Sequence, residues 1–298
     1  LGLSYRLPGG WSLNASTGRF FRLPSNTLVG FGTGGQFVNQ GLEYIRTDHY
    51  VAGVEWNPAP SRVFSLEGFL KVYGNYPVSL FTGLNLANTG ATFGVFGNEA
   101  VVSTGDGRAY GVELFAQQKL ENRFYGTGSL TLYRSEFRGA PGPGGARPFI
   151  PSTWDNRYLV AATAGYLIGT KKTWEIAARW RFSGGFRFTP FDLAASAPLF
   201  AENGGTVLDF SRVNAGVTPN FSQLDVRIDK KWFFQKWSLN IFLDLQNALN
   251  AKNPGPPGFA LQRNPDGSFA TGASGAFIPR LVAANAQLLP SIGILVRI

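Results

Sequence analysis

Long runs in which apolar and polar residues alternate are the feature that most constrains how this chain can fold. An alternation with a period of two places successive side chains on opposite faces of a β-strand. The clearest run is residues 173–188, and residues 223–232 and 236–246 repeat the pattern, with Lys230 as the one break in an apolar row. In the first run, the apolar face begins Trp174, Ile176, Ala178, Trp180, Phe182, and the polar face begins Thr173, Glu175, Ala177, Arg179, Arg181. These runs are longer than an ordinary strand of about five or six residues, and they suit tilted strands that cross a membrane.

The connections between the runs differ systematically in length. Short turns such as Pro8-Gly9 and Glu121-Asn122 alternate with long loops that cover roughly 23–41, 77–106, 138–154, 189–219 and 250–286. Outer-membrane barrels have short periplasmic turns and long extracellular loops. The pattern predicts about eleven strands, near residues 1–7, 10–22, 42–57, 62–76, 107–121, 123–137, 155–169, 172–188, 220–234, 236–249 and 287–298.

Composition supports a membrane-spanning β-structure. Charged residues make up 15% of the 298 residues and aromatic residues 14%, and the mean hydropathy is −0.03. No stretch approaches the roughly 18 to 20 consecutive apolar residues that a membrane helix needs. A chain that spans a bilayer without such helices has to form a closed β-barrel. Tryptophans gather towards the strand ends, as interfacial aromatic girdles require: Trp11, Trp56, Trp174, Trp232 and Trp237. We therefore expect an all-β, antiparallel transmembrane β-barrel.

The strand count suggests an incomplete barrel. The first and last strands both run towards the short-turn side, which makes the count odd, whereas bacterial single-chain barrels have even counts. The chain also begins with Leu1 instead of methionine. We expect residues 1–298 to be one partial barrel domain, the C-terminal half of a 22-stranded barrel, with the signal peptide outside this chain. The first and last strands should then not both be satisfied by native pairing, which leaves either an open curved sheet or a smaller closure with irregular pairing at the seam.

Several segments resemble the C-terminal barrel of TonB-dependent receptors, especially the Bacteroidetes-type group. They are GRAYGVELFAQQKL (107–120), PSTWDNRYLVAATAGY (151–166), WEIAARWRFSGGFRFTPFD (174–192), LDVRIDKKWFFQKWSLNIFLDLQNALN (224–250) and LLPSIGILVRI (288–298). The resemblance implies a receptor in the outer membrane of a Gram-negative bacterium that takes up a large, scarce nutrient. Siderophore, cobalamin, oligosaccharide and peptide ligands all stay open.

The resemblance also implies partners but no cofactor. The partners are outer-membrane lipid, the receptor's own plug domain and the energy-transducing TonB complex. The plug, and the segment that contacts TonB, would precede Leu1.

Charged residues on the polar faces are the candidate contacts for a ligand or for the plug. Guanidinium groups bind carboxylates and phosphates in a bidentate manner, although charges on a barrel wall commonly pair with one another. Arg179, Arg181 and Arg187 should form one basic stripe on a single strand, with Arg187 and Gln223 nearest the outer mouth. The candidates are Arg179, Arg181, Arg187, Gln223, Asp225, Arg227 and Asp244.

Other functional classes find little support in the residues. Cysteine is absent and His49 is the single histidine, which leaves no Cys/His metal site, and we expect no enzymatic activity. The net charge of +9 is scattered without a basic run, so we expect no nucleic-acid partner. Two alternatives remain open: a passive diffusion porin or adhesin barrel, and an outer-membrane barrel enzyme with a nucleophile or paired acids near His49.

Overall fold

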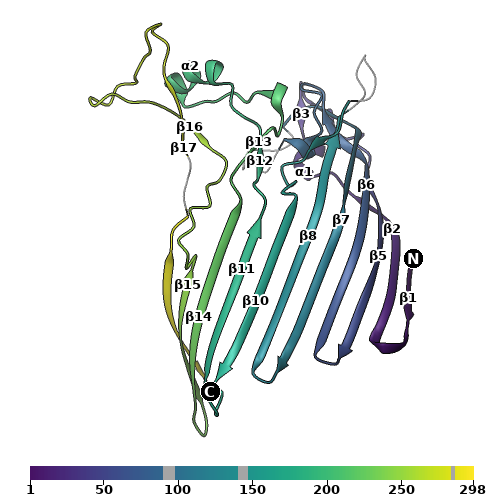
Figure 1. Cartoon of the computed structure of the whole chain (residues 1–298). Coiled ribbons are helices and arrows are strands. Elements are labelled where there is room, and N and C mark those ends of the chain that lie inside the picture. The colour runs from purple at the N-terminus through teal and green to yellow at the C-terminus, as the bar shows by residue number, and fades with distance from the viewer. Residues whose placement is uncertain (90–97, 140–146, 283–285) are drawn as a thin grey trace.

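One large antiparallel sheet dominates the fold. The computed structural model describes residues 1–89, 98–139, 147–282 and 286–298. Within these residues, eleven strands pair in sequence order, each with the strands before and after it on the path. The strands are β1 (Gly2–Arg6), β2 (Trp11–Arg22), β5 (Ile45–Ala59), β6 (Arg62–Ser79), β7 (Val101–Glu121), β8 (Phe124–Arg138), β10 (Tyr158–Ile168), β11 (Trp174–Ser183), β14 (Phe221–Phe233), β15 (Ser238–Gln246) and β18 (Leu289–Arg297). Figure 1 shows them as a curved wall with short turns at its lower end and long loops above.

The long loops carry the shorter elements. The helices are α1 (Asn26–Val29), α2 (Leu193–Asn203) and the 3-10 helices η2 (Leu86–Asn88) and η3 (Phe210–Arg212), while η1 (Pro8–Gly10) forms the first short turn. The short strands are β3 (Gly32–Thr33), β4 (Gln36–Phe37), β9 (Ile150–Pro151), β12 (Arg187–Phe188), β13 (Gly216–Val217), β16 (Gly258–Leu261) and β17 (Pro279–Val282). No helix among the described residues is long and apolar enough to cross a bilayer.

The sequence predicted the number and order of the main strands correctly. Two of them reach further into the long loops than expected, because β6 extends to Ser79 and β7 begins at Val101. Of the two expected outcomes at the sheet edges, the described residues show the open sheet. β1 pairs only with β2, and β18 pairs only with β15, so these two strands form the sheet edges in the described part of the chain.

The register confirms the predicted faces. Trp180 lies opposite Ala162 and Leu224, whereas its neighbour Arg179 lies opposite Thr163 and Asp225. Directly opposed residues of an antiparallel pair share one face of the sheet. One side of the wall is therefore apolar and includes Trp174, Trp180, Leu239 and Leu243. The other side is polar and includes Arg179, Arg181, Asp225, Arg227 and Asp244. We call them the apolar face and the polar face.

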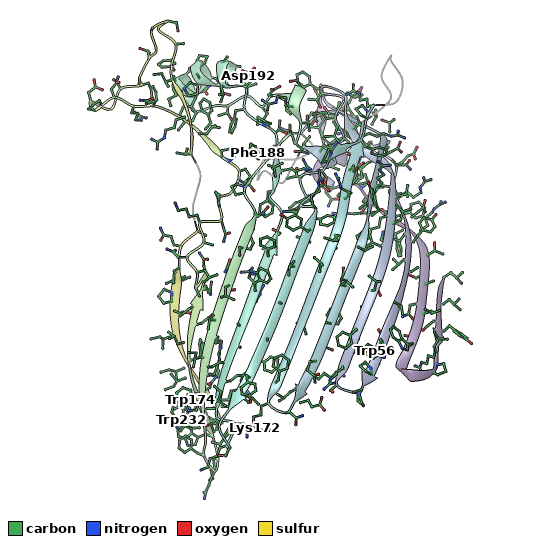
Figure 2. The ribbon with its side chains drawn as sticks, viewed as in Figure 1. Trp56, Lys172, Trp174, Phe188, Asp192 and Trp232 are labelled. Atoms are coloured by element: carbon green, nitrogen blue, oxygen red, sulfur yellow. The ribbon has the colours of Figure 1, made fainter. Side chains whose placement is uncertain are left out.

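The single strand expected over residues 172–188 is wrong at its C-terminal end. β11 stops at Ser183, and residues 187 and 188 form the separate strand β12. Figure 2 accordingly shows Phe188 among the upper loops, far from Trp174. Two glycines explain the break. A Cβ on Gly184 would lie 1.8 Å from the Asn156 carbonyl oxygen, and one on Gly185 would lie 1.8 Å from the Thr218 carbonyl oxygen. Loop backbones pack directly against these glycines, and the chain leaves the sheet there. The alternation of apolar and polar residues in the sequence nevertheless continues to residue 188.

Aromatic side chains mark the short-turn end of the apolar face. Trp11 and Trp56 stack with their ring centroids 5.3 Å apart, and Figure 2 shows Trp56, Trp174 and Trp232 towards the lower end of the wall. Lys230 lies between two of these rings, with its Nζ 4.9 Å from the Trp174 ring and 5.5 Å from the Trp232 ring. A lysine at this level can cover apolar surface with its stem and keep its ammonium among aromatic faces and polar groups. The one break in the apolar row is thus an interfacial residue.

Two long loops together build a small hydrophobic core above the wall. Ala197 of α2 and Phe259 and Leu261 of β16 are buried there. Around them pack Phe191, Phe200, Ala201, Phe269 and Phe277. We call this unit the loop cap. Its hairpin ends in a turn where the Ser268 hydroxyl and N–H both donate to Asp266, which holds the pKa of that carboxyl below its usual range.

Candidate functional site

The polar face carries a charged network near the short-turn end, which we call the wall network: Tyr125, Glu175, Arg227, Asp229, Lys231 and Asn240. These side chains come from β8, β11, β14 and β15, and they line a hollow of about 490 Å³. Alternation explains why they meet, because Glu175 lies opposite Asp229, and Lys231 lies opposite Asn240.

A glycine lets the network extend across three strands. Tyr125 on β8 lies opposite Gly165 on β10, where a Cβ would come within 2.3 Å of the tyrosine ring. Because Gly165 has no side chain, the ring reaches over β10 and its hydroxyl donates to Glu175 at 2.6 Å. Lys231 Nζ lies 2.7 Å from the other Glu175 oxygen. Glu175 therefore has one neutral and one cationic partner, each on a different strand.

The centre of the wall network is a bidentate ion pair. Arg227 donates to Asp229 through Nε at 2.7 Å and Nη2 at 2.9 Å, and Asn240 also donates to Asp229 at 2.7 Å. The Arg227 guanidinium lies 3.6 Å from the centroid of the Phe242 ring. A planar guanidinium that is stacked and doubly hydrogen-bonded is held in one orientation. The arrangement fixes charges of both signs on the wall.

A second cluster lies further towards the long loops, which we call the upper cluster: Arg179, Arg181, Gln223 and Asp225. Asp225 accepts from Gln223 at 2.7 Å and from the Asn247 backbone N–H at 3.0 Å, and its distance to Arg181 is 3.4 Å. Arg179 lies opposite Asp225, yet it forms no ion pair with the described residues. Arg181 Nε is buried and has no described acceptor. The upper cluster therefore contains guanidinium donors without an acceptor among the described residues.

The long loops are joined at their base by buried polar side chains, which we call the rim network: Asn39, Asn85, Asn88, Ser152, Asp155, Asn156, Arg187 and Asn214. Asp155 is 1% exposed and is its charged centre. It binds Arg187 Nε at 3.0 Å and Arg157 Nε at 3.1 Å, and it accepts from the Ser135 backbone N–H at 3.0 Å. An ion pair buried this deeply has to satisfy its remaining hydrogen bonds, as this one does.

Asparagines connect the rest of the rim network to the backbone. Asn214 donates to the Asn88 and Pro151 carbonyl oxygens, both at 2.9 Å, and Asn88 donates to the Phe137 carbonyl oxygen at 3.1 Å. Asn39 donates to the Leu28 and Glu99 carbonyl oxygens at 2.9 and 2.8 Å. An amide has two donors and an acceptor, so one buried asparagine can link two loops. The rim network thereby ties the long loops to each other and to the wall.

Six of the seven predicted site residues lie on the polar face of the wall, and one does not. Arg179, Arg181, Gln223 and Asp225 come together in the upper cluster, and Arg227 lies in the wall network. Asp244 lies on the polar face, as expected, and directly opposite Arg227, but the guanidinium binds Asp229 instead. Arg187 is a correction, because it does not extend the stripe of Arg179 and Arg181. The chain leaves the sheet at Gly184, and Arg187 binds Asp155 in the rim network.

No group of three or more His, Asp or Glu side chains is placed to bind a metal ion in the part of the chain that the structure describes. His49 lies on β5 beside Phe20, with ring centroids 4.7 Å apart. It has no hydrogen bond to a described side chain.

Comparison with known protein families identifies the family to which the chain belongs. A model described as "TonB dependent receptor-like, beta-barrel" matches residues 1–248. The chain belongs to the TonB-dependent receptor β-barrel family. No curated protein matches the chain. Membership of the Bacteroidetes-type group stays a prediction.

Solved structures of TonB-dependent receptors show the same fold. The ferric-catecholate import receptor Fiu from E. coli superposes with a TM-score of 0.62 at 10% identity, over 99% of this chain and 34% of that one. The pyoverdine outer membrane receptor FpvA from Pseudomonas aeruginosa superposes with a TM-score of 0.61 at 13% identity, over 98% of this chain and 35% of that one. The siderophore receptor PiuA from Acinetobacter baumannii superposes with a TM-score of 0.61 at 9% identity, over 99% of this chain and 35% of that one. The chain thus spans about a third of the length of the receptors it resembles.

Sequence reasoning missed most of the rim network and part of the wall network. Glu175 and Lys231 sat in the quoted alternation and could have been chosen as candidates. Tyr125 could not, because its reach depends on Gly165 in a different strand. The buried asparagines carry no periodic signal, since they lie in loops whose contacts form only after the strands have paired.

Proposed function

We propose that this chain forms part of the wall of an outer-membrane receptor that imports a large, scarce nutrient with energy supplied through TonB. The observation that carries the proposal is the separation of the two faces. One side of the sheet is apolar, with aromatic side chains at its short-turn end, as a lipid-facing surface is, and the other carries two charged clusters, as the inside of a barrel does. Membership of the TonB-dependent receptor family supports energised uptake over passive diffusion or catalysis.

The two charged clusters have different tasks in this proposal. The wall network is internally paired and lies near the short-turn end, so it provides a polar surface against which a plug domain packs. The upper cluster has unpaired guanidinium donors nearer to the loops, so it contacts the ligand. Anionic ferric chelates suit such donors, and siderophore and ferric citrate receptors are among the similar structures.

The membrane location has a direct test. Residues 1–298 contain no cysteine, so single cysteines introduced here report unambiguous positions within the chain. In intact cells that express the full-length protein, Ser274→Cys in the loop cap should react with a membrane-impermeant maleimide. Lys171→Cys in a short turn should react only after lysis. Labelling of both positions, or of neither, in intact cells would contradict the proposed topology.

Uptake has a second test. Cells that express the full-length receptor should accumulate a radioactive ferric siderophore from a screened panel, and the accumulation should stop when TonB is deleted. Arg181→Gln should weaken ligand binding by roughly tenfold, the effect expected for one charge-assisted hydrogen bond. Arg62→Gln, which lies at the opposite end of the wall, is the matched control. Uptake that persists without TonB would identify a diffusion porin instead.

A further inference from the structure

The apolar face is not uniform along the strands. Residues that lie opposite one another on β2, β5, β6, β7 and β8 form rows across this face, and three successive rows contain no charged or strongly polar side chain. The rows are Trp11–Trp56–Phe64–Ala116–Gly128, Leu13–Val54–Leu66–Leu114–Leu130 and Ala15–Ala52–Gly68–Val112–Leu132. They define the band that would face lipid hydrocarbon.

The next rows towards the long loops become charged on the same face. They are Thr17–Tyr50–Leu70–Tyr110–Arg134, then Arg19–Asp48–Val72–Arg108–Glu136, and then Phe21–Arg46–Gly74 with Asp106–Arg138. We call the five arginines of these rows the arginine belt: Arg19, Arg46, Arg108, Arg134 and Arg138. From the Trp11 row to the Arg19 row is eight residues, or about 27 Å along a strand at about 3.4 Å per residue. At the roughly 35–45° tilt of such strands, that length spans about 19–22 Å along the membrane normal, which is most of an apolar band about 25 Å tall. Arg134 lies one row short of this level, and the other four arginines lie at or beyond it, so most of the belt is at the upper boundary of the apolar band, where a headgroup layer would start.

Carboxylates orient four of these arginines without using all of their donors. Arg19 and Arg46 share Asp48, at 2.6 and 3.6 Å, Arg108 pairs with Glu136 at 2.7 Å, and Arg138 pairs with Asp106 at 2.9 Å. The four side chains stay between 32% and 57% exposed. A guanidinium has five N–H donors, and a bidentate pair occupies two of them. Each of these partly exposed side chains therefore keeps donors that its carboxylate does not use.

Two arginines of the belt lack a full set of hydrogen-bond partners among the described residues. Arg134 forms no ion pair and no side-chain hydrogen bond with the described residues. Arg46 Nε is one of four buried side-chain polar atoms without a described hydrogen-bond partner. The Phe149 ring lies between two further guanidiniums, 4.3 Å from Arg108 and 4.7 Å from Arg138, and fixes their positions. A nearby fourth carboxylate, Glu43, accepts from Asn75 and pairs with none of the belt.

The other half of the sheet lacks this belt. On β10, β11 and β14 the same end of the apolar face carries Tyr158, Trp180, Phe182, Ser222 and Leu224. Tyr158 donates to Asn220, Trp180 donates to Ser222, and the Phe182 ring stacks on both Tyr158 and Trp180. Apart from Ser222, these residues are aromatic or apolar, and none of them is charged. The belt is therefore a local feature of one arc of the wall.

We propose that the arginine belt binds the phosphate groups of an anionic glycolipid, the phosphorylated lipid A of the outer leaflet. Guanidinium groups bind phosphate through pairs of N–H donors, and basic residues at headgroup level attract anionic lipids. A lipid is favoured over a protein partner because the belt continues directly from the hydrocarbon-facing rows without a gap. The assignment rests on the proposed outer-membrane location and adds a specific lipid site to it.

Native mass spectrometry of the full-length protein in neutral detergent tests the site. The protein is titrated with bisphosphoryl lipid A, with monophosphoryl lipid A and with zwitterionic phosphatidylethanolamine. We expect tight binding of the first, weaker binding of the second and little of the third. The double variant Arg46→Gln with Arg134→Gln should bind bisphosphoryl lipid A roughly tenfold or more weakly, since each basic residue at the surface contributes to the attraction. The corresponding lysine variant should keep much of the affinity.

Arg123→Gln, in a short turn at the other end of the wall, is the matched control and should bind like the unmodified protein. Should the double variant fail to fold, Arg134→Gln alone decides the matter, because it breaks no ion pair among the described residues. Equal affinity for the three lipids, or an equal loss in Arg123→Gln, would overturn the site. The cysteine labelling separates this outcome from a failure of the location: a labelled Ser274→Cys with unchanged lipid binding removes the lipid site only.

Discussion

The wall network and the rim network both hold polar side chains in fixed positions, but they do so with different chemistry. In the wall network, charges on neighbouring strands pair across a face that opens onto a hollow, and Lys231 is 36% exposed. In the rim network, neutral amides and a single carboxylate are almost fully buried, and their partners lie far apart in the chain. Asn214 and Asn88, for example, are 126 residues apart. This difference in burial and in sequence separation indicates different roles: the wall charges make one face of the sheet polar, while the rim residues hold the loops in place.

The largest effect should follow from removing the charge at the centre of the rim network. Asp155→Ala leaves the buried Arg187 guanidinium, which is 11% exposed, without a counter-charge. Breaking a buried ion pair in this way costs about 3–5 kcal/mol. The midpoint of denaturant unfolding of the full-length protein in lipid measures the change. Asp106→Ala is the matched control, because its carboxylate is 49% exposed and also pairs with an arginine. A similar loss of stability in both variants would show that burial does not make the Asp155 ion pair more important than an exposed ion pair.

The two faces of the wall should differ almost as much. Leu130→Arg places a charge in the middle apolar row, at a cost of about 2–4 kcal/mol at the bilayer midplane. Ser129→Arg places the same side chain on the polar face, next along the same strand, and should be tolerated. Heat-modifiable gel mobility after folding into lipid vesicles compares the two yields. If the two variants fold equally well, the assignment of the faces is wrong.

Asparagines of the rim network should matter for the loops more than for the wall. Asn214→Ala leaves the Asn88 and Pro151 carbonyl oxygens without their donor, at about 1–3 kcal/mol for an unsatisfied buried group. We expect faster limited proteolysis of residues 186–218 while the strands stay protected. Asn264→Ala, at the exposed tip of the loop cap, loses a hydrogen bond to Ser268 and should leave the proteolysis rate unchanged. Equal rates for the two variants would mean that Asn214 does not hold the loops.

The smallest effect should come from the wall network itself. Lys231→Gln removes an ion pair with Glu175, but both groups are partly exposed and Glu175 keeps the Tyr125 hydroxyl. Pairs of this kind contribute about 0–1 kcal/mol, and salt screens them. Raising the salt concentration should therefore shrink the difference between Lys231→Gln and the unmodified protein, whereas the Asp155→Ala difference should persist. A loss from Lys231→Gln that salt does not reduce would remove the contrast between the two networks.

Much of the wall could be predicted because its rules are local. Alternation assigned Trp180 and Arg179 to opposite faces, and loop lengths predicted eleven strands in the order observed. The same rule failed at Arg187, because the alternating pattern continued after Gly184 had already turned the chain out of the sheet. Nothing local to Gly184 shows that the Asn156 carbonyl oxygen occupies the place of its missing side chain.

The sequence by itself determined the strand order and the two faces. These depend on side-chain period and turn chemistry, which act between residues close together in the chain. The tertiary structure alone decided that Asp155 would meet Arg187, that Asn214 would bridge two loops, and that Tyr125 would reach Glu175 across Gly165. Each of these contacts requires the register of several strands at once, and no single segment contains that register. The arginine belt lies between the two cases: alternation places each arginine on the apolar face, but only the pairing of β2, β5, β7 and β8 brings the five together.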